Sequence, residues 1–450
     1  MSDDRPESPP AARAATGVTE PERPITFREV FAVREYRAVY AALIASWVGD
    51  YLARAAITVL VYQQSKSVLL SAAAFAVSYL PWLLGGPVLT ALAERYPYRR
   101  VMVICDLLRA GLILILVVPG LPIPAMLLVV FLVMLANPPA QAARSALQPL
   151  VLTREQLPTA MAASATTVQA AQVVGYLAGA TLAAAVHPGL AILTDSVMFL
   201  LSALLILTGV RPRPAALGAG QRRHLLHETG EGFRLVFGSR VLRSIALMAF
   251  SLGAFAIVPE GLAAAWAALG TADEFARGVD QAIIMAAGPV GFVIGGLAVS
   301  RLVAPAARDS LVRPLAIMAP LVLVPALAAP PAEVVALLTL VSGVAQGGLM
   351  PTLNTQFVLA LPHGFRARAF GVMQQGMQLS QGGAVLLTGV LADRWSLPVV
   401  VGLWSVGGVL LMLGLAVRWP SSALVNREIE RAELRVAVRR EATRVTPAHG

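Results

Sequence analysis

Long apolar stretches separated by short polar loops dominate the pattern of this chain. A hydrocarbon core of about 30 Å needs about 20 helical residues to cross it. Twelve stretches are long enough, at residues 38–62, 69–91, 101–119, 122–145, 159–184, 189–209, 244–268, 281–303, 314–330, 333–357, 368–391 and 397–418. Strands of membrane barrels are shorter and alternate in polarity. The pattern therefore predicts an all-α membrane protein with twelve transmembrane helices.

The basic residues follow the same pattern from loop to loop. Thirty of the 35 lie in the two terminal segments and in alternate loops, and Lys66, Arg277 and Arg394 lie on the opposite side. Lys and Arg collect on the cytoplasmic side of membrane proteins. We therefore expect a multi-pass protein of the cytoplasmic membrane with both termini in the cytoplasm.

One long polar segment divides the twelve stretches into six and six. The expected organisation is a disordered tail (1–27), a first six-helix bundle (28–209), a cytoplasmic central loop (210–243), a second six-helix bundle (244–418) and a basic cytoplasmic tail (419–450). A shift of 206 positions places Gln169 and Gln172 over Gln375 and Gln378. The shift indicates a duplication, and transporters built from repeats bind substrate near the midplane between the halves.

Composition excludes several other classes of protein. Charged residues make up 13% of the chain and hydrophobic residues 57%, whereas soluble domains are about 25% charged. The net charge of +10 resides in the loops, so it does not indicate a nucleic-acid partner. The sole lysine, Lys66, follows Ser65, so no phosphate-binding loop is present and an ion gradient is the expected energy source. Neither a cofactor nor a metal site is expected.

Several short motifs resemble those of the major facilitator superfamily. They are Gly49-Asp50, Ala93-Glu94-Arg95 with Arg99-Arg100, and Asp106-Leu107-Leu108-Arg109-Ala110. Within that superfamily the chain is similar to the branch of enterobactin exporter-like and actinobacterial efflux proteins. The resemblance implies two six-helix bundles, alternating access and outward transport. The antiporter pattern of the superfamily has Gly-Pro in the fifth span, where this chain has Gly175-Tyr176.

Ionisable residues inside the spans are the candidates for coupling to protons or cations. A charge at mid-bilayer costs at least about 2.5–3.5 kcal/mol, and Asp50 lies near the middle of the first span. Arg54 follows four residues later on the same helical face, so the two side chains either neutralise each other in a static pair or take part in coupling. The shift of 206 positions also places Glu260 opposite Arg54, which suggests a contact between the halves.

A second set of charges is expected to control gating. Asp106 and Arg109 are three residues apart and can pair locally. The loop after the second span can lock one conformation; ordinary positive-inside charges are the alternative and explain Arg99 and Arg100, but not the acid beside them. That loop carries Glu94, Arg95, Arg99 and Arg100. Asp195 lies near the outer end of the sixth span, where we expect it to contact water or headgroups.

Amides and one aromatic residue are the candidates for contacting a substrate. They are Trp47, Gln169, Gln172, Asn354, Gln375 and Gln378. Hydrogen bonds between helices are the competing interpretation for the amides.

The sequence thus predicts a proton-coupled exporter of a small amphipathic organic molecule such as a drug, siderophore or secondary metabolite. Proton-coupled uptake of a nutrient or siderophore is the alternative, and an intramembrane enzyme using Asp50 and Asp195 is a third hypothesis without a recognisable motif. The expected partners are the small-molecule substrate, protons and anionic lipids of the inner leaflet. The lipid contact is assigned to an arginine stripe that begins at Arg427. We expect a monomer.

Overall fold

The structure is a computed structural model that describes residues 26–82, 95–153, 155–214, 225–361, 366–420, 424 and 427. Its helices are α1 (Phe27–Ala32), α2 (Arg34–Ser65), α3 (Val68–Val77), α5 (Tyr98–Ile115), α6 (Ile123–Leu135), α7 (Asn137–Val151), α8 (Leu157–Ala185), α9 (Pro188–Gly209), α10 (Leu225–Gly238), α11 (Arg240–Ala256), α12 (Val258–Gly261), α13 (Ala263–Gly270), α14 (Glu274–Leu302), α15 (Pro305–Arg308), η1 (Asp309–Leu311), α16 (Val312–Leu321), η2 (Val324–Ala328), α17 (Ala332–Ala360), α18 (Arg366–Ala392) and α19 (Leu397–Val417). No strand occurs among these residues.

The all-α membrane fold predicted from the apolar stretches is confirmed. Nine helical segments in the described ranges are long and apolar enough to cross a membrane. Predicted spans four, seven and nine are broken rather than continuous. The fourth consists of α6 and α7, joined at Ala136, the seventh of α11, α12 and α13, and the ninth of α16 and η2. Pro138 and Pro259 lie just after the first breaks in the fourth and seventh spans, where a proline ring prevents a continuous helix.

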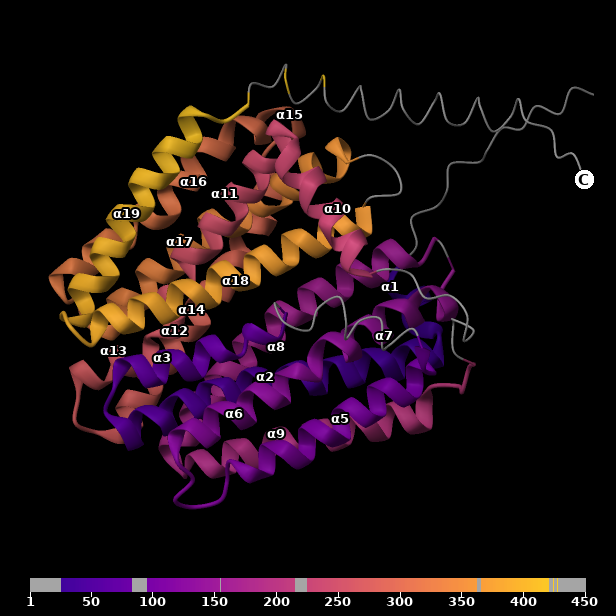
Figure 1. Cartoon of the computed structure of the whole chain (residues 1–450), viewed down its shortest axis with the longest axis horizontal. Helices are drawn as coiled ribbons and strands as arrows, with labels where there is room; N and C mark the ends of the chain where they lie inside the picture. The colour runs from indigo at the N-terminus through magenta and orange to yellow at the C-terminus, as the bar shows by residue number, and fades with distance from the viewer. Residues whose placement is uncertain are drawn as a thin grey trace, which may run out of the picture.

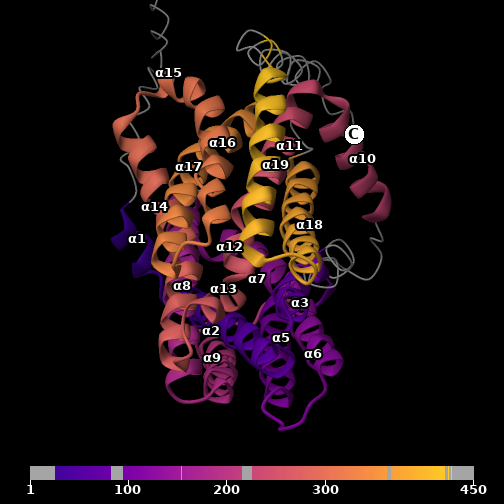
Figure 2. The ribbon, with the colours of Figure 1, turned by 90° about the vertical axis from the view of Figure 1, so that its left-hand side faces the viewer.

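The helices form two bundles that lie against each other (Figure 1). Helices α1–α9 form the N-terminal bundle and α11–α19 the C-terminal bundle, and the turned view in Figure 2 shows the same division. The bundles meet mainly where α8 packs on α14 and where α3 packs on α18. The chain ends of the described helices, at α1 and α19, lie toward the same end of the molecule, which we call the termini end. The opposite end is called the far end.

Small residues allow the closest packing inside the C-terminal bundle. Helices α14 and α17 approach so closely that a Cβ atom on Gly295 would collide with the carbonyl of Val344, and one on Gly347 would collide with the carbonyl of Phe292. Helices in membranes associate through such stripes of small residues, because lipid supplies no hydrophobic force between them.

The central loop differs from the prediction because it contains a helix, α10. Val236 is fully buried, and the backbone at Gly232 lies against Arg368 of α18. The apolar residues Leu235, Val236 and Phe237 of this segment pack on the C-terminal bundle, as the apolar face of an amphipathic helix does. The predicted N-terminal tail up to residue 25, Glu94, residues 215–224 and the stripe beyond Arg427 lie outside the described residues.

Candidate functional site

A cavity of about 520 Å³ lies between the two bundles. Eight of the twelve spans contribute to its wall. The polar side chains that line it are Tyr51, Arg54, Ser78, Tyr79, Asn137, Gln141, Gln169, Gln172, Glu260, Thr339, Gln346, Asn354, Gln374, Gln378 and Gln381. Tryptophan, methionine and phenylalanine side chains complete the wall. Among the described residues, the cavity therefore combines many neutral hydrogen-bonding groups with apolar surface and only two charged side chains.

The carboxylate in this cavity, Glu260 of α12, connects the two bundles. It accepts a hydrogen bond from the Tyr176 hydroxyl at 2.5 Å and one from the Gln172 amide at 3.4 Å. Both donors belong to α8 of the N-terminal bundle. Tyr176 is fully buried and Glu260 is 6% exposed, so solvent weakens these bonds little.

The cation in the cavity, Arg54 of α2, lies among aromatic rings. Its guanidinium carbon is 5.3 Å from the ring centres of Tyr51 and Tyr79 and 5.5 Å from that of Phe75. One of its terminal nitrogens donates to the Tyr79 hydroxyl at 3.5 Å. Its Nε atom has no hydrogen-bond partner in the described part of the chain. Stacking on aromatic faces holds an arginine while leaving donors for a ligand.

Arg54 and Glu260 therefore share one cavity, as the shift of 206 positions suggested. Their contact is indirect: Arg54 lies over the ring of Tyr51, which packs edge-on against Tyr176, the donor to Glu260. Tyr176 stands where the antiporter pattern has proline, and the unexpected residue is the one that binds Glu260. The tyrosine in place of proline at position 176 was the sequence signal for this contact, although the sequence did not show that Glu260 is its partner.

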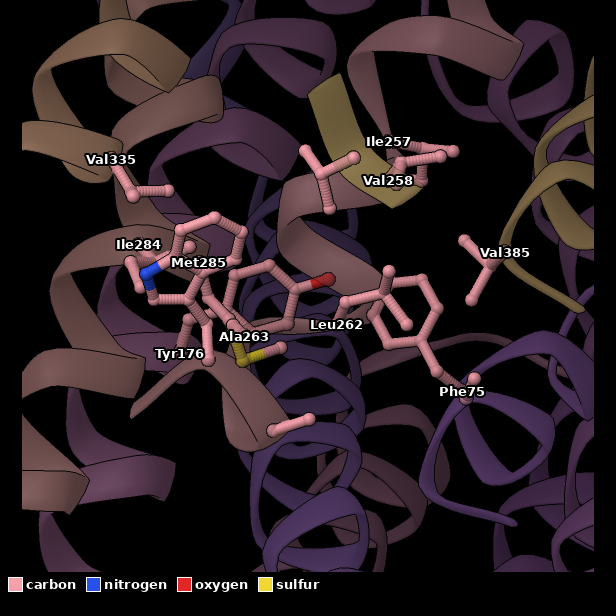
Figure 3. Close-up of a cluster of buried hydrophobic side chains, with 14 of the residues drawn as sticks. Phe75, Tyr176, Ile257, Val258, Leu262, Ala263, Ile284, Met285, Val335 and Val385 are labelled. Atoms are coloured by element: carbon pink, nitrogen blue, oxygen red, sulfur yellow. The ribbon is translucent and has the colours of Figure 1, made fainter. Parts of the chain in front are cut away.

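An apolar cluster closes the cavity toward the far end. Figure 3 shows Phe75 and Tyr176 of the N-terminal bundle beside Ile257, Leu262 and other residues of the C-terminal bundle. In the same half of the molecule, the Gln281 amide donates to the Ala55 carbonyl and to the Thr58 hydroxyl, both at 3.1 Å.

At the far end itself, Asp393, the residue directly after α18, joins the bundles again. It accepts hydrogen bonds from the Ser67 hydroxyl and the Leu69 amide, each at 3.4 Å. Near the termini end the lining residues Asn354 and Gln374 are exposed, and Phe370 is 40% exposed. The cavity is therefore closed at the far end and open toward the termini end.

Asp50 does not line this cavity and does not pair with Arg54. It forms a buried ion pair with Arg109 of α5. Arg109 also donates to Ser46 at 3.3 Å and lies 4.1 Å from the ring centre of Phe199. Asp106 accepts a hydrogen bond from Ser202 at 2.6 Å. The static Asp50–Arg54 pair and the local Asp106–Arg109 pair expected from spacing are both corrected, because partners on neighbouring helices are better placed.

Asp195 is also not where the sequence suggested. It is 1% exposed and lies inside the N-terminal bundle, so it does not contact water or headgroups at the surface. The expectation was wrong because the face that carries Asp195 packs against α2 and α5. Arg144 is similarly buried, at 4% exposed, and donates to Gln141 at 3.1 Å.

The predicted gating arginines lie near the termini end. Arg95 and Arg100 are exposed. Arg99 donates to the carbonyl of Leu207 at 2.5 Å, which ties α5 to α9 within one bundle. Glu94 lies outside the described residues. In this conformation the hydrogen bond from Arg99 to Leu207 is internal to the N-terminal bundle, and a gating role stays a prediction.

Most of the predicted substrate contacts do line the cavity. Trp47, Gln169, Gln172, Asn354 and Gln378 are part of its wall. Gln375 is not, and this placement is corrected. Gln374, Gln378 and Gln381 line it instead, because positions four and three residues apart share a helical face that excludes Gln375.

Comparisons with known proteins agree with this architecture. The sequence matches the family model of the Major Facilitator Superfamily over residues 39–323. A search of curated proteins gives no match.

Solved structures show the same fold at low sequence identity. The nucleoside transporter NupG is 12% identical with a TM-score of 0.66, covering 86% of this chain and 100% of that one. A bacterial homolog to the human lysosomal transporter Spinster, inward-facing and occupied, is 14% identical with a TM-score of 0.62, covering 89% and 97%. A structure on substrate recognition in proton dependent oligopeptide transporters is 12% identical with a TM-score of 0.64, covering 88% and 99%.

Proposed function

Since the chain belongs to the major facilitator superfamily, it is a secondary active transporter, and we propose that it exports a small amphipathic organic molecule in exchange for protons. The observation that carries this proposal is the cavity between the bundles. Transporters with repeated halves hold their substrate near the midplane between those halves, and this cavity is lined by residues of both bundles.

The wall of the cavity favours an amphipathic substrate. Its volume of about 520 Å³ falls within the range of about 300–1,000 Å³ that is usual for sites of drug-sized ligands. Trp47 and the methionines offer apolar surface, and the amides offer donors and acceptors on both bundles. With one cation and one carboxylate, the cavity selects by shape and hydrogen bonding more than by net charge.

Export is the proposed direction, and it is compatible with the charge of the loops and with the open end of the cavity. If the positive loops are cytoplasmic, the termini end faces the cytoplasm and the cavity is open to that side. A substrate would then enter from the cytoplasm and leave after the far end opens. The gating role predicted for Arg95, Arg99, Arg100, Asp106 and Arg109 belongs to this proposal, and in the present conformation Arg99, Asp106 and Arg109 make their contacts inside the N-terminal bundle.

Glu260 is the link between proton and substrate in this proposal. Its hydrogen bonds to Tyr176 and Gln172 cross the interface between the bundles, so any change in its protonation changes the strength of that interface. Arg54 in the same cavity supplies a positive charge that a substrate can approach. Asp50, which is paired with Arg109 outside the cavity, is the third residue that we assign to proton coupling. The cavity is complete within one chain, which supports a functional monomer.

The test uses the full-length purified protein. A thermal-shift screen of drugs, siderophores and metabolites selects a compound, which is then assayed by counterflow in proteoliposomes that contain a pH-sensitive dye. We expect an imposed proton gradient to drive the compound in the direction opposite to the protons, and the dye to report the matching movement of protons.

Two variants make this test specific. Glu260→Gln removes the ionisable group from the cavity, and we expect proton-driven transport to fall at least tenfold while counterflow persists. Glu333→Gln removes an exposed acid at the far end of α17 and should leave both unchanged. Proton-driven transport at the wild-type rate in the Glu260→Gln variant would contradict the proposal, and transport in the same direction as the protons would establish uptake instead.

A further inference from the structure

A cluster of five charged side chains lies inside the N-terminal bundle, apart from the cavity. It contains Asp50 of α2, Asp106 and Arg109 of α5, Arg144 of α7 and Asp195 of α9. Their exposed fractions are 3%, 1%, 1%, 4% and 1%. None of the five lines the cavity between the bundles. The cluster is therefore a separate buried site that substrate binding alone does not explain.

The charges in this cluster do not balance. Three carboxyl groups face two guanidinium groups, so the cluster would carry one net negative charge if every member were ionised. Asp50 is neutralised by Arg109, and Asp106 accepts a hydrogen bond from Ser202. An unpaired ion in a buried site is strongly unfavourable, and such groups neutralise by binding a proton.

Asp195 is the carboxyl group that has no compensation. Neither of its oxygens has a hydrogen-bond partner among the described residues. It lies directly against Gly49, because a Cβ atom added to Gly49 would collide with its Oδ1 atom. Asp195 therefore lies beside Gly49, the residue before Asp50. The positive charge of Arg109 attracts the Asp195 carboxyl group as well as that of Asp50.

The helices packed against α9 are α2, α5 and α8. From α2 the facing group is Asp50, and from α5 the facing groups are Asp106 and Arg109. The only titratable side chain of α8 is Tyr176, whose hydroxyl is bonded to Glu260. Asp195 therefore faces two carboxyl groups and one cation, and that cation is already paired with Asp50.

We propose that Asp50 and Asp195 together form a proton-binding site, in which Arg109 neutralises one carboxylate and a single bound proton neutralises the other. In the structure Arg109 holds Asp50, so the proton resides on Asp195 as a neutral carboxylic acid. Proton binding forms one O–H bond on a carboxylate oxygen, and release returns both carboxylates to the ionised form. Release requires a second cation to approach, and Arg144 is the remaining one in the cluster.

A polar link connects this site to the cavity. Arg144 donates to Gln141 at 3.1 Å, and Gln141 lines the cavity wall. A substrate that displaces Gln141 frees Arg144 to move toward the carboxyl groups, which favours loss of the proton. Substrate and proton then compete without sharing a site. This coupling role rests on the proposed exporter function, whereas the presence of the bound proton does not.

Infrared difference spectroscopy of the full-length protein tests the proton directly. A protonated carboxyl group has a C=O stretch that is separate from carboxylate bands and shifts in heavy water. At neutral pH we expect the wild-type protein to show this band, and Asp195→Asn to lose the amplitude of one carboxyl group. Asp273→Asn, which changes an exposed N-cap outside the cluster, should retain it.

Two further variants keep the assignment falsifiable. Asp50→Asn should also lose the band, because Arg109 becomes free to pair with Asp195 and ionise it. Asp195→Glu should keep a band at a shifted frequency, which assigns it even if Asp195→Asn folds poorly. A band that is unchanged in both Asp195 variants would overturn the proposal.

The outcome is distinguishable from failure of the exporter function. A band assigned to Asp195 in a protein that transports without protons would establish the buried proton site and disprove proton coupling. Proton-driven export in a protein without such a band would disprove this site and place the coupling proton elsewhere, with Glu260 the remaining carboxyl group in the cavity.

Discussion

The hydrogen bond between Tyr176 and Glu260 provides the sharpest test of how the bundles are held together. It joins the two bundles at 2.5 Å, and its members are 0% and 6% exposed. A hydrogen bond to a charged group contributes about 1.5–3 kcal/mol, and about 1.4 kcal/mol corresponds to a factor of ten in an equilibrium constant. If this bond forms only while the far end is closed, Tyr176→Phe shifts the equilibrium toward far-end opening by about 10- to 100-fold.

The shift can be measured as a distance between spin labels. Lys66 and Trp395 are exposed at the far end, on opposite bundles, and both can be replaced by cysteine in a Cys105→Ala background. Double electron–electron resonance then gives the fraction of molecules with a wide far end. We expect this fraction to rise in Tyr176→Phe.

A matched control and a second background separate this bond from general loosening. Tyr40→Phe removes a hydroxyl that contacts Thr167 within the N-terminal bundle, and it should leave the distances unchanged. In the Glu260→Gln background the same Tyr176→Phe change should contribute only about 0.5–1.5 kcal/mol, as for a bond between neutral groups. Equal distance distributions for wild type, Tyr40→Phe and Tyr176→Phe would refute the reasoning.

Three further predictions concern stability and binding. Arg109→Gln leaves a buried carboxylate without its ion pair and should lower the free energy of unfolding by about 3–5 kcal/mol in denaturant titrations; a change below about 1 kcal/mol would contradict the buried pair. Gly295→Ala forces α14 away from α17 and should destabilise by about 1–3 kcal/mol, whereas Gly414→Ala meets no atom within 4 Å and should be neutral. Gln378→Ala should weaken binding of the screened compound about five- to tenfold, the cost of about 1 kcal/mol for a lost hydrogen bond, and Gln375→Ala, outside the wall, should not.

Hydropathy alone was enough to predict the architecture. The apolar stretches located the helices because a bilayer fixes both their length and their polarity. Hydropathy did not predict α10, because its apolar face is too short to be read as a span and finds its partner on α18.

The partners of the buried charges could not be predicted in the same way. Spacing along one helix favoured Asp50 with Arg54, but Asp50 pairs with Arg109, which is 59 positions away in sequence. Such a pair depends on how α2 and α5 face each other, and hydropathy carries no information on helix rotation. For the same reason Asp195 was expected in water and Gln375 in the cavity, although each lies on another face of its helix.

The proposal that the two bundles rock around the cavity is tested most directly by measuring both ends of the molecule in the same preparation. Met161 of α8 and Leu302 of α14 are exposed near the termini end, on opposite bundles. Spin labels at this pair and at the far-end pair Lys66 and Trp395 report the two openings, with and without the compound from the screen. We predict opposite changes, so that the distance at the termini end shortens whenever the distance at the far end lengthens. Distances that stay fixed, or that lengthen together, would contradict alternating access by these bundles.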